Sequence, residues 1–263
     1  MTNRKPIDES TLLEEVRRYL KALRCTTMAG ELANMLGAPT YGSMSHLQWV
    51  HHLVKTEVNQ RTYTRTIRYL RESGIGLGDP SDLDRIRNPS KRGIDTSVLG
   101  SFKTGEWLEG SYVPGVLITG ATGTGKTFLV KGICKITCMK GYRTRYLRMP
   151  QFLEELRRAD EHNQMAEYRS RLNNFKVLAI DDWGMAPMDD RQRSDFLSIL
   201  DERIGKSGMI IASQLEIDQW YAYIKDAFHA DAIMDRLTHG SHLMELKGES
   251  MRKLTAPKLK KHK

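Results

Sequence analysis

The sequence has few cysteines and no long hydrophobic run, and each shortage excludes a class of protein. Three cysteines among 263 residues, Cys25, Cys134 and Cys138, rule out a disulfide-knit scaffold, and no second pair of Cys or His ligands accompanies Cys134 and Cys138 as a zinc finger requires. No apolar run approaches the roughly 18 residues of a membrane span. The charged N-terminus also lacks the pattern of a signal peptide. We therefore expect reduced, structural cysteines, no membrane contact and a cytoplasmic location.

Charge is distributed unevenly along a chain of otherwise ordinary globular composition. The formal net charge is +9, with 40% hydrophobic and 28% charged residues. Residues 1–75 carry 11 basic and 7 acidic side chains, and residues 247–263 carry 7 and 1. Residues 140–176 hold 9 basic and 5 acidic side chains, whereas residues 177–246 hold 6 and 13. Basic surfaces thus flank an acidic half, which favours an anionic partner, most simply nucleic acid.

The first 75 residues have helical periodicity. Apolar residues recur at helical spacing from Thr11 to about Leu36, after several residues that could cap a helix. A second helix is predicted from Ser43 or Ser45 to about Leu70, where the glycine-rich segment 74–80 ends it. The sequence therefore predicts a small all-helical N-terminal domain over residues 1–75.

Three arginines lie on one face of that second helix. Arg61, Arg65 and Arg68 fall at i, i+4 and i+7, so they project together like a row of phosphate contacts. The alternative is an ordinary solvent-exposed face. Residues 76–110 mix Asp, Pro, Gly and Ser, which predicts a connector followed by one short helix.

From residue 111 to 246 the pattern changes to short β-rich runs that alternate with helical segments. The predicted strands cover residues 115–119, 144–148, 177–181, 209–213 and 242–246. Strands that alternate with helices form parallel sheets covered on both faces. The expected fold class is therefore α/β, with a five-stranded parallel sheet after the helical N-terminal domain.

A glycine-rich motif stands between the first predicted strand and an apolar helix. It fits GxxxxGK[ST], the phosphate-binding loop, in the strand–loop–helix context that this motif requires. Its backbone would surround the phosphates, Lys126 would neutralise their oxygens and Thr127 would ligate magnesium. The predicted cofactors are ATP and magnesium, and the binding residues are Gly120, Ala121, Thr122, Gly123, Thr124, Gly125, Lys126, Thr127 and Phe128.

A second acidic element follows the third predicted strand. Four apolar residues, 177–180, lead directly into Asp181 and Asp182. Asp181 would hold the magnesium, and Asp182 would act as the base or orienting group for an attacking water. A capping pair after a strand is the alternative. Because another strand lies between the two motifs in sequence, the motif strands need not be neighbours in the sheet.

These motifs and their order resemble the DnaC/IstB branch of the AAA+ ATPases, and within it the IstB family of ATP-binding helpers of insertion-sequence transposases. The resemblance covers almost the whole chain. Its most specific segments are LKALRCTTMA (20–29), IDDWG (180–184), ASQL (212–215), AIMDRL (232–237) and ELKGESMRK (245–253).

The resemblance implies roles for several further residues. Ser213, or Gln214 beside it, is similar to the polar sensor of the γ-phosphate, with a strand-end turn as the alternative. Arg236 matches the arginine finger that reaches a neighbouring subunit, which implies a homo-oligomer; Arg203 is the other candidate, and an ion pair with Asp231 or Asp235 is the structural alternative for Arg236. Arg252 matches the second sensor, or else is a loose tail residue.

The sequence also departs from the wider superfamily. Only residues 247–263, a basic tail, follow the last predicted strand, so a C-terminal lid is expected to be absent or vestigial and a DnaA-type initiator is disfavoured. Asp182 stands where many relatives carry glutamate, which leaves the rate of hydrolysis open. Phe102, Trp107 and Leu108 are weak candidates for the adenine pocket.

A basic cluster around the second predicted strand is the expected DNA path. In this branch the corresponding region tracks DNA, and phosphate contacts would bind duplex DNA largely independently of sequence. The favoured function is an ATP-dependent regulator that assembles on target DNA and recruits the transposase of the same mobile element. A DnaC-like helicase loader and a nucleotide-gated architectural protein are the alternatives. The cluster consists of Lys140, Arg143, Arg145, Arg148, Arg157 and Arg158.

Overall fold

The chain divides into two compact units. The computed structural model describes residues 8–251, and the two units meet between Arg65 and Thr66. That boundary falls inside helix α3 (His46–Glu72) rather than after it, whereas the sequence predicts an N-terminal domain that ends at residue 75. The last turns of α3 therefore belong to the second unit.

The first unit is helical, but its first predicted helix is two helices. Helix α1 (Glu9–Ala22) and helix α2 (Thr26–Gly37) are separated at Arg24, whose φ of 59° ends the first helix. No glycine or proline marks this turn in the sequence, so apolar periodicity alone does not reveal it. Ser45 begins α3 as predicted: its hydroxyl accepts the Gln48 N–H at 3.3 Å, and its own N–H donates to the Gln48 side chain at 2.7 Å.

A buried carboxylate joins α2 to α3 in this unit. Glu57 Oε2 accepts the N–H groups of Thr27 and Met28, each at 3.0 Å, at the start of α2. Ala29, Met35 and Glu57 are the buried residues within the described part of this unit, so its core is small. Helix α3 is the longest described helix, and no described helix is long and apolar enough to cross a membrane.

The second unit is built on a parallel sheet. Its strands are β1 (Val116–Thr119), β2 (Thr144–Arg148), β3 (Val177–Trp183), β4 (Gly208–Ser213) and β5 (His242–Glu245), in the order β2-β3-β4-β1-β5. All neighbouring pairs are parallel, which confirms the predicted five-stranded sheet. Strand β4 lies between the two motif strands β1 and β3, so these strands are not neighbours.

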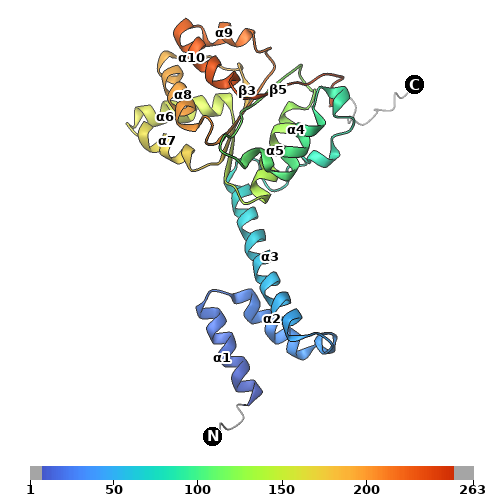
Figure 1. The fold of residues 1–263 in the computed structure, drawn as a ribbon. Coiled ribbons are helices and arrows are strands. Elements are labelled where there is room, and N and C mark those ends of the chain that lie inside the picture. Colours follow the sequence, from blue (N-terminus) through green and yellow to red (C-terminus); the bar gives the residue numbers. More distant parts are fainter. Residues whose placement is uncertain (1–7, 252–263) are drawn as a thin grey trace, which may run out of the picture. The chain divides into compact units, whose positions relative to one another are not determined.

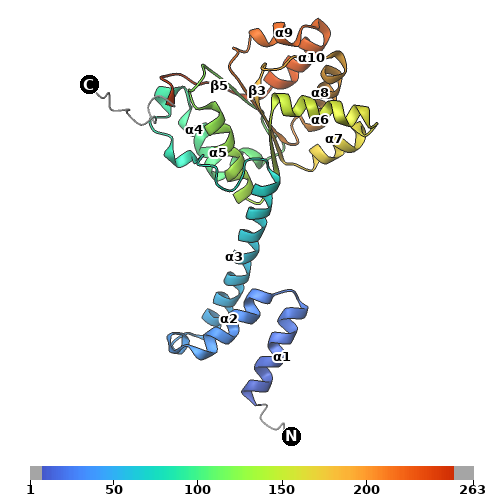
Figure 2. The ribbon, with the colours of Figure 1, turned by 180° about the vertical axis from the view of Figure 1, so that it is seen from behind.

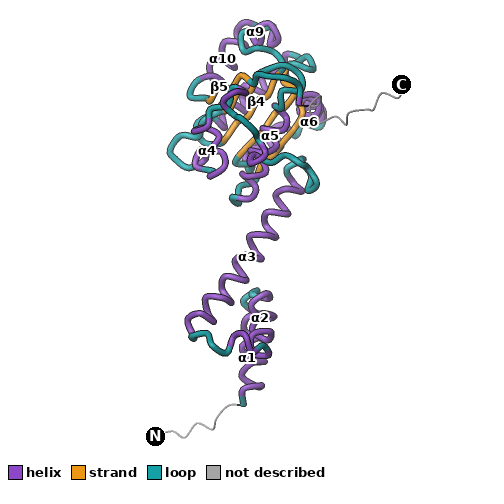
Figure 3. Tube along the Cα trace, turned by 90° about the vertical axis from the view of Figure 1, so that its right-hand side faces the viewer, coloured by secondary structure: helices purple, strands orange, loops and turns teal. Residues whose placement is uncertain are grey.

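Helices cover both faces of this sheet (Figures 1, 2 and 3). Helices α4 and α5 lie on one face, and α6, α7 and α8 lie on the other with α9 and α10. The three inner strands, β1, β3 and β4, bury side chains on both sides, as their nearly continuous apolar runs require. These helices are α4 (Thr96–Thr104), α5 (Lys126–Met139), α6 (Met149–Glu161), α7 (Met165–Asn173), α8 (Asp190–Arg203), α9 (Gln219–Ile224) and α10 (Ala227–Thr238).

The segment expected to be a connector contributes to the core. Leu83, Ile94 and Phe102 are at most 3% exposed and pack in the same cluster as the residues of α5. Three short 3-10 turns flank the predicted short helix α4: Leu83–Arg85, Ser90–Arg92 and Glu106–Leu108. The Pro- and Gly-containing composition of residues 76–110 thus reflects tight turns packed on the sheet rather than a free linker.

Candidate functional site

The phosphate-loop motif joins the carboxyl end of β1 to the start of α5. Gly120, Gly123 and Gly125 have φ values of 135°, 85° and 101°. Residues that carry a side chain rarely adopt such backbone angles. Lys126 is the first residue of α5, and its Nζ donates to the carbonyl oxygens of Gly120 and Ala121 at 2.5 and 2.9 Å. The loop therefore has the curled backbone and the lysine placement that the motif predicts.

The chain returns to this loop after β5, which sequence reasoning did not foresee. The Leu246 N–H donates to the Thr119 carbonyl and the Met251 N–H to the Gly123 carbonyl, both at 2.8 Å. A Cβ atom on Gly120 would lie 2.3 Å from the Leu246 carbonyl oxygen. Glycine at position 120 is thus required by close approach of another backbone as well as by its own conformation.

Asp181 lies beside the threonine of the loop. The Thr127 hydroxyl donates to Asp181 Oδ2 at 2.7 Å, and the Tyr146 hydroxyl donates to the same oxygen at 2.9 Å. The other oxygen, Oδ1, accepts the Asp182 N–H at 2.9 Å, and Asp181 is 1% exposed. Burial and the adjacent carboxylate raise the pKa of Tyr146, so its phenol remains a donor.

Asp182 occupies a different environment from Asp181. Its φ is 60°, and the pairing register between β3 and β4 shifts between Ile180 and Trp183. The Asp182 carboxylate lies 3.5 Å from Arg148 Nε, which comes from the end of β2. The carboxylate is partly exposed, so it is accessible to solvent where Asp181 is not.

The residues present suit a nucleotide with magnesium. Magnesium prefers oxygen ligands and is usually held by one or two protein groups plus phosphate oxygens. Thr127 and Asp181 bring a hydroxyl and a carboxylate together at the end of the loop. Within residues 8–251, no group of three or more His, Cys, Asp and Glu side chains forms a metal site, so phosphate oxygens and water would supply the remaining ligands.

The two candidates for the polar sensor are used differently. Ser213 is fully buried, and its hydroxyl donates to the Trp183 carbonyl at 2.8 Å and accepts the Leu215 N–H at 3.0 Å. Gln214 instead contacts the phosphate loop, because its Oε1 accepts the Thr122 hydroxyl at 2.6 Å. The geometry therefore gives Ser213 a structural role in the turn after β4 and favours Gln214 as the sensor.

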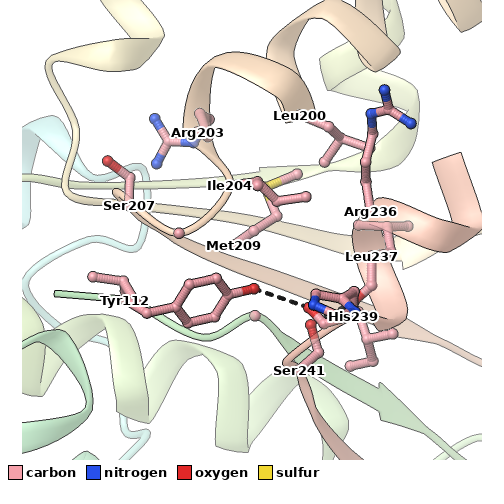
Figure 4. Close-up of a pocket in the computed structure, with 14 residues that line it drawn as sticks. Tyr112, Leu200, Arg203, Ile204, Ser207, Met209, Arg236, Leu237, His239 and Ser241 are labelled. Carbon is pink, nitrogen blue, oxygen red and sulfur yellow. Dashed lines mark hydrogen bonds between the residues drawn. The ribbon is translucent and has the colours of Figure 1, made fainter. Parts of the chain in front are cut away.

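The two finger candidates line one small cavity of about 20 Å³ near the amino ends of the strands (Figure 4). Arg203 is 1% exposed and donates to the carbonyl groups of Leu172, Phe175 and Gly208. Burial lowers the pKa of Arg203 to about 10. Such a side chain cannot reach another subunit, so the alternative assignment to Arg203 is wrong.

Arg236 stands apart from its own chain's phosphate loop. It is partly exposed, pairs with Asp201 and donates to the Ala232 carbonyl at 2.9 Å. An ion pair of Arg236 was the structural alternative, but its acidic partner is Asp201 rather than Asp231 or Asp235. The loop follows the carboxyl end of β1, whereas Arg236 lies near the amino end of β5, so a catalytic contact would require a second copy.

The predicted adenine candidates are wrong. Phe102, Trp107 and Leu108 are at most 5% exposed. Trp107 lies where a side chain on Gly208 would be, and Phe102 stacks edgewise near His242, both at the amino ends of strands. These side chains fill the core at the amino ends of the strands, whereas the phosphate loop follows the carboxyl end of β1.

An arginine that sequence reasoning missed lies on the phosphate loop. Arg92 Nη2 donates to the Thr124 carbonyl at 2.5 Å, and the Arg92 carbonyl accepts the Lys247 N–H. Arg92 also contacts the Met251 side chain. No motif marked this residue, because it lies in the segment read as a connector. Arg252, the predicted second sensor, lies outside the described residues, directly after Met251.

The arginines of α3 differ in their surroundings. Arg61 Nε donates to Glu57 at 2.7 Å, and its Nη2 donates to the Arg24 carbonyl at 2.7 Å, so this side chain is tied to its own unit. Arg65 is exposed, and Arg68 lies 4.0 Å from Glu72. Equal spacing on the helix therefore does not mean equal availability for phosphates.

The basic cluster of the second unit separates into distinct places. Arg143, Arg145 and Arg158 line a cavity of about 550 Å³ together with Arg171, which the sequence analysis did not single out. Most of these arginines have acidic partners: Arg143 pairs with Glu72, Arg145 with Glu155, and Arg157 and Arg158 with Glu154. Lys140 is exposed after α5, and Arg148 lies at Asp182.

Comparison with known families gives one consistent result. A family model described as IstB-like ATP binding protein matches residues 18–258. An insertion sequence ATP-binding protein of Sinorhizobium fredii is 30% identical over 238 residues, 90% of this chain and 94% of that protein. Another, of Pseudomonas fluorescens, is 31% identical over 198 residues, 74% of this chain and 84% of that protein.

Solved structures share the fold of this chain. The crystal structure of DnaI has a TM-score of 0.54 at 19% identity, over 64% of this chain and 92% of that chain. The DnaC helicase loader has a TM-score of 0.51 at 20% identity, over 68% and 99%. AMPPCP-bound DnaA from Aquifex aeolicus has a TM-score of 0.53 at 20% identity, over 67% and 54%. These likenesses confirm the predicted AAA+ fold.

Proposed function

The chain belongs to the family of IstB-like ATP-binding proteins, and on that premise we propose that it is an ATP-dependent, DNA-binding regulator of transposition. It would oligomerise on target DNA and recruit and activate the transposase of the same mobile element, with ATP hydrolysis as a timer. The observation that carries the proposal is the hydrogen bond of Thr127 to Asp181 at the end of the phosphate loop, in a chain whose relatives are insertion-sequence ATP-binding proteins.

The nucleotide would be held by the loop and by residues around it. The backbone of residues 120–127 and the N-terminus of α5 would surround the phosphates, and Lys126 would exchange its two loop carbonyls for phosphate oxygens. Thr127 and Asp181 would hold magnesium, which when bound neutralises charge on the β- and γ-phosphates. Arg92 would stabilise the loop through its hydrogen bond to the Thr124 carbonyl.

Hydrolysis would depend on Asp182 and on a neighbouring subunit. Asp182 is partly exposed beside Asp181 and is the candidate that orients the attacking water. Gln214, bonded to Thr122, would sense the γ-phosphate. Arg236 would reach the site of a second copy once it leaves Asp201, and Arg252 would act within its own chain. Because aspartate at position 182 is one methylene shorter than glutamate, turnover would be slow.

Duplex DNA would bind through phosphates rather than bases. The cavity lined by Arg143, Arg145, Arg158 and Arg171 offers closely spaced guanidinium groups, the side chains that bind phosphate best. DNA would compete with the acidic partners of these arginines, so binding would weaken steeply with salt. Arg65, Arg68 and Lys140 are further exposed candidates.

Light scattering after size exclusion tests this function. Wild type and Lys126→Ala are run with duplex DNA in ATP, in ADP and without nucleotide. We expect a large DNA-bound assembly with ATP only, and only for the wild type. Arg158→Ala should reduce the slope of log affinity against log salt by about 1. Arg85→Ala, which removes another exposed arginine with one acidic partner, should leave the slope unchanged.

A negative result has a defined meaning. If the wild type stays small and ignores duplex DNA in every nucleotide state, the regulator proposal is refuted. The alternative function, loading of a replicative helicase, would then be tested by co-elution with a helicase. That alternative is retained because the DnaC helicase loader shares the fold over 68% of this chain.

A further inference from the structure

Tyr146 is a buried tyrosine that contacts the nucleotide site without belonging to any motif. It comes from β2, at the edge of the sheet, and is 6% exposed. In the register of the sheet Tyr146 pairs with Ala179 and Arg148 pairs with Asp181, so Tyr146 and Asp181 lie on the same face, two residues apart along the strands. This placement brings the Tyr146 hydroxyl to 2.9 Å from Asp181 Oδ2.

We propose that Tyr146 is a positioning residue that holds the Asp181 carboxylate in the orientation in which it binds magnesium. The inference rests on the proposed nucleotide function. Thr127 donates to the same oxygen, and when its hydroxyl turns to the metal, the Tyr146 hydroxyl remains on Asp181. The backbone N–H of Asp182 holds the other oxygen, so the carboxylate is fixed at both ends. Hydrogen bonds to metal-binding carboxylates orient them and tune their affinity.

The tyrosine ring is itself held in place. Lys131 Nζ lies 5.3 Å from the centre of the Tyr146 ring, and Lys131 is fixed by an ion pair with Asp79 at 2.8 Å. Lys131 follows Thr127 by one turn of α5. The helix that carries the Thr127 hydroxyl therefore also contacts the Tyr146 ring.

The test compares two tyrosines that make the same kind of bond. Tyr146→Phe removes the donor to Asp181. Tyr168→Phe removes an equally buried donor, to Glu155 at 3.1 Å, outside the nucleotide site. Binding of a fluorescent ATP analogue is measured while magnesium is titrated, and again in EDTA. Thermal melting of each variant checks that it is folded.

We expect Tyr146→Phe to raise the magnesium concentration for half-maximal binding by about 10–100-fold. Binding in EDTA should not change, because Lys126 and the loop remain, and Tyr168→Phe should behave as the wild type. In an Asp181→Asn background the Tyr146→Phe change should have no further effect. Lys131→Gln, which keeps the hydroxyl but frees the ring, should shift the midpoint in the same direction by a smaller factor.

The outcomes distinguish a failure of the Tyr146 proposal from a failure of the proposed nucleotide function. If the wild type binds no nucleotide with or without magnesium, the proposed function fails. If the wild type binds and Tyr146→Phe has the wild-type magnesium midpoint, only the role of Tyr146 is refuted. The role of Tyr146 is also refuted if Tyr168→Phe shifts the magnesium midpoint as much as Tyr146→Phe does. The same holds if Tyr146→Phe causes its full shift in the Asp181→Asn background. Should Tyr146→Phe fail to fold, the Lys131→Gln midpoint decides the question.

Discussion

Substitution of Gly120 by alanine should destabilise the second unit even when no nucleotide is present. The Gly120 φ of 135° costs a residue with a side chain about 1–3 kcal/mol. A Cβ atom there would also lie 2.3 Å from the Leu246 carbonyl oxygen, an overlap with backbone that cannot rotate away. Overpacking of this kind costs about 1–3 kcal/mol more. The total expected loss for Gly120→Ala is therefore about 2–6 kcal/mol of unfolding free energy.

Gly248→Ala is the matched control for this change. Gly248 has a φ of 105°, but a Cβ atom there would meet nothing within 4 Å, so only the conformational cost applies. Urea unfolding followed by tryptophan fluorescence, in nucleotide-free buffer, gives the two losses with their m-values. We expect Gly120→Ala to lose about 1–3 kcal/mol more than Gly248→Ala. Equal losses would refute the claim that the return of the chain at Leu246 requires glycine at position 120.

Two further predictions concern titrating groups. Burial by itself would raise the pKa of Asp79, but hydrogen bonds from Lys131 and Ser81 hold this pKa below its ordinary value of 3.8. The Asp79 carboxylate therefore stabilises the fold above that pH. The stabilisation should disappear as the pH falls below 3.8, and Asp79→Asn should flatten the curve of unfolding free energy against pH in that range. Burial raises the pKa of Cys138 to about 11 and that of Cys134 well above its usual value. At pH 8 iodoacetamide should therefore label half-buried Cys25 alone, as read by peptide mass spectrometry; native labelling of Cys134 or Cys138 would contradict this.

Elements with strong local patterns were predictable from the sequence. The five strands, the loop 120–127 and the start of α3 at Ser45 all depend on residues that are adjacent in the chain, such as a capping residue or an apolar run. The break at Arg24 carries no sequence signal, because an arginine rarely adopts a positive φ and no glycine or proline lies beside it. The packing of segment 76–110 was not predictable, because Pro, Gly, Asp and Ser occur both in linkers and in turns that pack on a core. Only the burial seen in the structure distinguishes these two cases.

The candidate site shows the same division. Lys126, Thr127 and Asp181 follow from motifs, since their spacing is set by one loop and one strand end. Gln214 could not be preferred over Ser213, because neighbouring residues at a strand end point in different directions and only the turn after β4 decides which reaches Thr122. The exclusion of Arg203 required its burial.

Sequence alone determined the family, the parallel sheet and the phosphate loop with its acidic partner, because each is encoded by short segments whose chemistry is local. Only the tertiary structure decided which distant residues complete the site. Arg92 reaches Thr124 and Tyr146 reaches Asp181 because the strand order β2-β3-β4-β1-β5 and the turns around it bring separate segments together. Contacts of this kind depend on the packing of the whole sheet, so the spacing of residues along the chain does not predict them.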